Sequence, residues 1–288
     1  MTSRTVEKIT VVVAVGVLGV ALAVNVRSPL VLLLVGALVV TVSAGLDLVL
    51  RGEARYRPTP DLFVLPAALA VGAVLFLQLL DTGVSIVAGL TAFGALLFAV
   101  FWAEHRLRGT PADPRLAVTV LSVVGYIAAF VLYAAIYQAK TRTLISAPAI
   151  VLITFLLGVR QFRLSLEGSE GKGIEGKSIE SKGSEGQGVE GAAATAGTTV
   201  PATPWPRTLL YAASVALAVG EITWALNYWP LNGLFGGAFL LSTFYFLIGL
   251  LSHHLQRRLS RRLMAEYGVV VMVGTLLIAV AGLFRRVT

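Results

Sequence analysis

Glu221 is the residue best placed to do chemistry, because it is an acidic side chain deep inside a long apolar segment. It lies eight residues before Trp229, which ends that segment, and this is about 12 Å along a helix. A charged side chain at the centre of a membrane-spanning helix costs about 2.5–3.5 kcal/mol or more, so such residues commonly mark functional sites. Helical spacing places Trp224, Asn227 and Tyr228 on the same face as Glu221.

Two interpretations of this face are open. In the first, Glu221 is a proton or cation site, or part of a ligand pocket with an aromatic wall, and Gln78 adds a polar group from another segment. In the second, the carboxyl is protonated or hydrogen-bonded and locks its helix to a neighbour, with Trp224 and Tyr228 in an interfacial aromatic belt. No basic residue lies at a matching depth, which favours a neutral or water-contacting carboxyl over a buried ion pair.

Other charged side chains near the segment ends are expected to be interfacial. Asp47 and Arg51, like Glu104 and Arg108, are spaced i, i+4, which suits ion pairs at a helix end. Further along, leucines recur every four residues with arginines between them, a pattern typical of a helix on a membrane surface. The arginines expected to contact anionic lipid head groups are Arg257, Arg258, Arg261 and Arg262.

Neither a metal, a cofactor nor an enzymatic activity is expected. The chain has no cysteine and three histidines, His105, His253 and His254. Adjacent histidines on a helix point about 100° apart, so the last two are poor ligands for one ion. No Walker A, H-E-x-x-H or G-x-S-x-G motif occurs, and the loops are too short for a soluble catalytic domain. Only an intramembrane enzyme built on Glu221 would fit, and it is disfavoured.

The composition is that of a helical membrane protein. The 288 residues are 57% hydrophobic and 13% charged, against about 45–50% and about 25% in soluble domains. The net charge of +8 comes mostly from short loops, where the membrane explains it, so no nucleic-acid partner is expected. The predicted fold is an all-α polytopic transmembrane bundle. Its nine candidate spans lie near 9–25, 29–50, 61–80, 83–103, 116–138, 143–159, 208–229, 232–252 and 266–284.

The basic residues predict a topology with the N-terminus inside and the C-terminus outside. This arrangement puts most of the 23 Lys and Arg residues on the cytoplasmic side, as the positive-inside rule requires. The outer side holds Arg27, Lys140, Arg142, Arg285 and Arg286. The first segment, with Ala21-Leu22-Ala23 near its end, also resembles a signal peptide, but its apolar run is long for one and an uncleaved span is preferred.

The chain divides into three regions by composition. Residues 1–166 form an N-terminal membrane bundle and residues 207–288 a C-terminal hairpin with the last span. Between them, 167–206 contains five pentapeptide repeats of the type SEGKG and then an Ala-, Thr- and Pro-rich stretch. A period of five fits neither a helix face nor a strand face, so this region is predicted to be a disordered cytoplasmic linker. A weaker regularity, with landmarks repeated about 147–150 residues apart, suggests two tandem four-helix halves.

One resemblance covers the last third of the chain. The pattern Glu221-x2-Trp224, then Tyr245, a basic stretch over 257–262 and Glu266-Tyr267 resembles uncharacterised multi-pass bacterial membrane proteins that are grouped as a domain of unknown function. The resemblance implies a bacterial cytoplasmic (plasma) membrane and adds no activity.

The expected function follows from these features. The first hypothesis is a non-catalytic scaffold or accessory membrane subunit, embedded in the lipid bilayer, with a membrane-protein partner or as a homo-oligomer. The alternative is a small-molecule or ion transporter, proton-coupled through Glu221, with a midplane cavity lined by Glu221, Asn227 and Gln78. The spans lack the Gly/Pro interruptions at matching positions that are typical of transporters, which favours the scaffold.

Overall fold

The computed structural model describes residues 3–26, 30–53, 56–80, 82–109, 114–139, 143–180, 205–229 and 231–255, together with Gly268, Val269, Met272 and Gly274. Within 143–180, side chains are described from 146 to 167. Eight helices occupy this part of the chain: α1 Ser3–Asn25, α2 Leu30–Leu50, α3 Pro60–Leu77, α4 Gly83–Gly109, α5 Arg115–Gln138, α6 Thr143–Glu180, α7 Trp205–Leu226 and α8 Gly233–Leu255. All eight contain a stretch long and apolar enough to cross a membrane. The all-α prediction is confirmed for the described residues.

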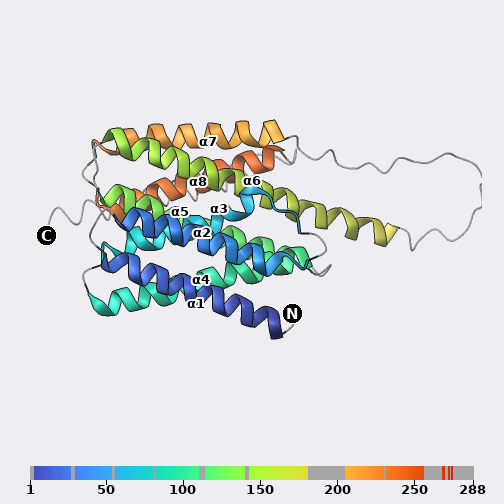
Figure 1. The fold of residues 1–288 in the computed structure, drawn as a ribbon. Coiled ribbons are helices and arrows are strands. Elements are labelled where there is room, and N and C mark those ends of the chain that lie inside the picture. The colour runs from blue at the N-terminus through green and yellow to red at the C-terminus, as the bar shows by residue number, and fades with distance from the viewer. Residues whose placement is uncertain are drawn as a thin grey trace, which may run out of the picture.

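The helices pack side by side in one bundle (Figure 1). Helix α5 is central and contacts α3, α4, α6 and α8, while α1 and α2 cover one side against α3 and α4. Helix α7 lies at the opposite edge and packs mainly on α6 and also on α8. This edge position leaves one face of α7 without a neighbour among the described helices.

Small residues bring the helix backbones close together, as is common in membrane bundles. A Cβ atom added to Gly158 of α6 would lie 3.7 Å from the Cα atom of Ala212 on α7. A Cβ atom added to Gly237 of α8 would lie 2.7 Å from the Cα atom of Ala134 on α5. The α5–α8 contact is therefore so close that it requires glycine.

Polar bonds between helices reinforce this packing. The hydroxyl oxygens of Tyr133 on α5 and Thr154 on α6 lie 2.8 Å apart. The Tyr137 hydroxyl donates to the carbonyl of Leu226, 2.8 Å away, at the end of α7. The backbone N–H of Gly233 donates to the side-chain oxygen of Gln138 over 2.7 Å. These last two bonds fix the turn between α7 and α8 against the end of α5.

Two regions predicted from the sequence, the linker and the ninth span, are described only in part. Helix α6 continues to Glu180, so the beginning of the region expected to be disordered is helical here, and 181–204 lie outside the described residues. Adding residues to an existing helix costs much less than starting one, which accounts for the extension. Of the ninth predicted span only four residues are described, and one of them, Gly274, lies against Ser242 of α8.

The suggested division into two four-helix halves is not visible in the packing. Helix α5, the last of the first proposed half, packs closely on α8 of the second half and also on α6. The described helices thus form a single bundle around α5.

Candidate functional site

Three helices meet at a buried group of charges at the end of the bundle where α3 begins and α4 ends. Arg160 of α6 is fully buried and lies between two buried carboxylates, those of Asp61 on α3 and Glu104 on α4. Its Nη1 atom donates to Oδ2 of Asp61 over 3.2 Å, and its Nη2 atom donates to Oε1 of Glu104. A single guanidinium thus links α3, α4 and α6.

Two further arginines complete this group. Arg163 Nη1 pairs with the second oxygen of Asp61, and Arg108 Nε lies 3.3 Å from the second oxygen of Glu104. We call these five residues the Arg160 cluster: Asp61, Glu104, Arg108, Arg160 and Arg163. Each of the four carboxylate oxygens is bonded to a guanidinium, the geometry in which charge-assisted bonds are strongest.

The position of the cluster follows from the local sequence of each helix. Pro60 is the first residue of α3, where its missing N–H costs nothing, and this sets Asp61 in the first turn. Arg160 stands seven residues before Glu167, the last residue of its apolar stretch, about 10 Å from the end of that stretch. The spacing of Glu104 and Arg108 predicted an interfacial pair at a helix end, but Glu104 is buried. The i, i+4 pair itself is confirmed.

The cluster pairs opposite charges across three helices. Every carboxylate oxygen in it accepts a bond from a guanidinium. Among the described residues no group of three His, Asp or Glu side chains is placed to hold a metal ion. Removing one charge from such a cluster leaves its partners buried and unpaired, so the three helices depend on one another.

Polar groups on the neighbouring loop extend this end of the bundle. His105 Nδ1 lies 3.1 Å from a carboxylate oxygen of Glu53. The Tyr56 hydroxyl donates to Asp47, which also pairs with Arg51 at 2.6 Å. Burial and the hydrogen bond to Asp47 raise the pKa of Tyr56 to about 12. Tyr56 is therefore a neutral donor at physiological pH and holds the α2–α3 loop to the end of α2.

The sequence-predicted face of α7 points away from the bundle. Glu221, Trp224, Asn227 and Tyr228 are all exposed, with 60% of Trp224 and 82% of Tyr228 accessible. Leu217, one turn before Glu221, is exposed as well. We call Leu217, Glu221, Trp224 and Tyr228 the α7 face. Among the described residues no ion pair or side-chain hydrogen bond engages Glu221.

The opposite side of α7 is built for close packing. Its buried residues are Thr208, Ala212, Val215, Ala216, Val219, Gly220, Thr223 and Leu226. A Cβ atom on Gly220 would meet the side chain of Val151 on α6. Helix α7 therefore packs closely on α6, and this packing determines the direction in which the α7 face points.

The remaining predicted site residues do not join Glu221. Gln78 is exposed at the C-terminal end of α3, and α3 and α7 do not pack against each other within the described helices. His254 lies beside Tyr211, with a ring separation of 6.3 Å. The arginines of 257–262 lie outside the described residues.

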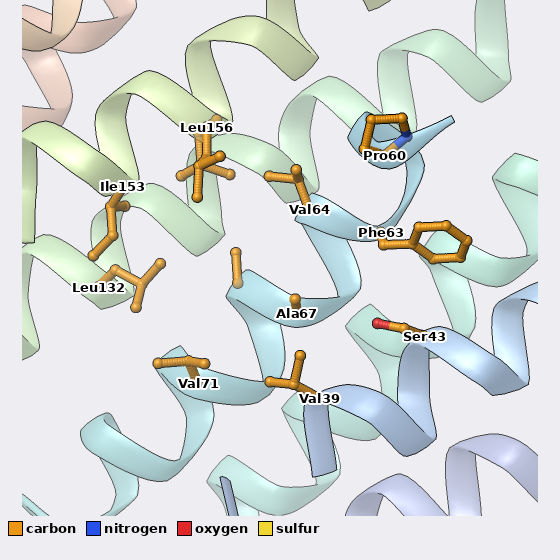
Figure 2. A pocket seen from close by; sticks show the side chains of 12 residues that line it. Val39, Ser43, Pro60, Phe63, Val64, Ala67, Val71, Leu132, Ile153 and Leu156 are labelled. Atoms are coloured by element: carbon orange, nitrogen blue, oxygen red, sulfur yellow. The ribbon is translucent and has the colours of Figure 1, made fainter. Parts of the chain in front are cut away.

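An apolar groove lies between α2, α3 and α6, on the side of α6 that faces α3 rather than α7. It has a volume of about 360 Å³ and is lined by eleven apolar residues and Ser43. Figure 2 shows Ala67 and Val64 of α3 facing into it, with Val39 of α2 on one side and Leu156 of α6 on the other. None of the residues predicted from the sequence as a polar site lines this groove.

The fold and the helix composition fit a multi-pass helical membrane protein. A family model described as "Protein of unknown function (DUF5656)" matches residues 9–172 and 192–281. The chain belongs to this family, and the match covers most of the chain rather than only its last third, as the sequence resemblance had suggested. Searches of curated proteins and of solved structures found no match.

Proposed function

We propose that this protein is a non-catalytic scaffold or accessory subunit of a membrane complex, and that it binds a transmembrane helix of its partner through the α7 face. The partner is another membrane protein or a second copy of this chain. With the predicted ninth span, the N-terminus lies in the cytoplasm of a bacterium and the C-terminus outside its plasma membrane, in accord with the distribution of basic residues.

The observation that carries this proposal is the exposure of Glu221. It lies sixteen residues into a helix that begins at Trp205, at a depth where a carboxyl facing hydrocarbon is costly. A hydrogen-bond donor on a neighbouring helix offsets part of that cost, since polar contacts between membrane helices are worth about 0.6–2 kcal/mol each. Trp224 and Tyr228 on the same face add large, rigid contact surfaces of the kind enriched at protein interfaces.

Two other features support a structural role over transport. The two carboxylates of the Arg160 cluster are paired with three arginines, and this excess of positive charge disfavours the binding of a transported cation there. The groove between α2, α3 and α6 contains no charged residue and lies on a different side of α6 from the α7 face. The cavity that a transporter would build from Glu221, Asn227 and Gln78 has no counterpart in the packing of the described helices.

Site-specific cross-linking in native membranes tests the proposal. A photoreactive amino acid at Leu217, next to Glu221 on the α7 face, should give a discrete protein adduct. The same group at Val123, which is exposed on α5, is the matched control and should label lipid only. Glu221→Leu should reduce the Leu217 adduct several-fold, while Glu221→Gln, which keeps hydrogen-bonding groups, should retain most of it. Lipid labelling alone at both positions would contradict the proposal.

A further inference from the structure

We propose that the groove between α2, α3 and α6 binds an acyl chain of a membrane phospholipid, whose phosphate group contacts Arg163 at the bundle end that carries the Arg160 cluster. This site is separate from the α7 face, and the proposal does not depend on the proposed function.

The groove has the chemistry of a hydrocarbon site. One hydroxyl, that of Ser43, is the single side-chain polar group among its twelve lining residues. Leu156 lines the groove and is 40% exposed, so the groove opens onto the apolar surface of the bundle. In a bilayer this surface faces lipid chains, and an open apolar groove there offers extra contact area to a chain that enters it.

The length of the groove matches one leaflet. Its lining runs along α3 from Pro60, the first residue of the helix, to Val71. Eleven residues of helix span about 16 Å, and half of a hydrocarbon core about 30 Å thick is about 15 Å. A groove that starts at a helix end and stops near the midplane fits a chain that enters from one leaflet.

A partly exposed cation lies beside the first turn of α3, the turn at which the groove begins. Asp61 follows Pro60 in the chain and pairs with Arg163, whose side chain is 26% exposed. The Arg163 guanidinium also lies 4.9 Å from the ring centre of Trp205. A guanidinium has five N–H donors, so Arg163 has the capacity to donate to a phosphate while it holds Asp61. An arginine beside an exposed tryptophan is typical of the head-group region.

Native mass spectrometry on the purified full-length chain tests this site. After detergent delipidation, phosphatidylglycerol is added back and the fraction of chains with one retained lipid is measured. Ala67→Trp places an indole in the groove and should lower that fraction at least threefold. Ala95→Trp, at an exposed position of α4, is the matched control and should leave it unchanged. Arg163→Gln should lower it as well, whereas Arg51→Gln, an exposed arginine at the same bundle end, should not.

A second measurement needs no variant. Phosphatidylglycerol with a photoreactive group in its acyl chain should label peptides of α3 and α6 that contain groove residues. Labelling spread evenly over the exposed helices would overturn the proposal. Equal lipid retention by the wild type and Ala67→Trp would also overturn it, as would a dimer that dissociates in Ala67→Trp, because the occupant would then be a second copy. A circular dichroism spectrum and a melting temperature of Ala67→Trp that match those of Ala95→Trp would show that a loss of lipid does not come from misfolding.

Discussion

Replacement of Arg160 by leucine should lower the free energy of unfolding by about 3–5 kcal/mol, because it leaves two buried carboxylates without their shared partner. Asp61 and Glu104 lie on different helices, so the loss should loosen α3 and α4 from α6 together. Arg160→Lys should recover only part of the stability, since an ammonium lacks the fork of donors that bridges two carboxylates. Unfolding of the purified protein in detergent, followed by circular dichroism, measures the effect.

Arg51→Leu is the matched control for this prediction. Arg51 also pairs with an acidic side chain, that of Asp47, but 68% of its own side chain is exposed. Exposed ion pairs contribute about 0–1 kcal/mol, so this variant should unfold close to the wild type. If Arg160→Leu and Arg51→Leu were equally mild, the Arg160 cluster would not be a structural link between the helices.

Gly237→Val should be the most disruptive small change in the α8 helix. A Cβ atom at this position would lie 2.7 Å from both the backbone nitrogen and the Cα atom of Ala134. Backbone atoms cannot rotate away as a side chain does, so α8 has to move off α5. Overpacking of this kind costs about 1–3 kcal/mol, and more where both neighbours are backbone. The melting temperature in detergent should fall, and hydrogen exchange should increase in α8 and the adjoining part of α5.

Gly36→Val provides the comparison. A Cβ atom added to Gly36 of α2 would meet no atom within 4 Å, and valine is a slightly better helix former than glycine. This variant should therefore be neutral or slightly stabilising. A Gly237→Val variant as stable as Gly36→Val would show that α5 and α8 do not approach each other as closely as the structure indicates.

The helices themselves were largely predictable from the sequence, because hydrocarbon imposes long apolar segments. The predicted segment 83–103 corresponds to α4, Gly83–Gly109, and the predicted segment 208–229 corresponds to α7, Trp205–Leu226. The end of α4 and the start of α7 differ because hydropathy marks the apolar run, whereas a helix continues through polar residues as long as its backbone bonds are made. Glu104 and Arg108 lie in such an extension of α4.

The Arg160 cluster was not predictable in the same way. Its charges come from three separate helices, α3, α4 and α6, and a single sequence does not show which of their faces meet. The available signal was their depth, since Asp61, Glu104 and Arg160 all lie near the ends of apolar segments expected on one side of the membrane. The positive-inside rule also accounts for Arg160, and it explains a basic residue without requiring a partner.

The spacing in the sequence predicted that Glu221, Trp224 and Tyr228 share one helix face, but it left the direction of that face open. Helical spacing is sufficient to place Glu221, Trp224 and Tyr228 together. In a membrane helix, however, the sides that face lipid and protein are both apolar, so periodicity does not reveal which one is buried. The close packing of Gly220 and its neighbours on α6 determines that direction. The groove, which arises from the shapes of three helices, leaves no mark on any one of them.

The labelling of Glu221 by a hydrophobic carbodiimide is the most direct measurement of the proposed docking role, with Glu221→Gln as the control. In native membranes, where a partner helix covers the α7 face, Glu221 should be protected. After purification of the single chain in detergent it should react, and in Glu221→Gln the peptide that contains position 221 should remain unlabelled in both preparations. Rapid labelling in native membranes that varies with pH would contradict the proposal. It would mean that water reaches a titrating carboxyl at membrane depth, as a proton-coupled transporter requires.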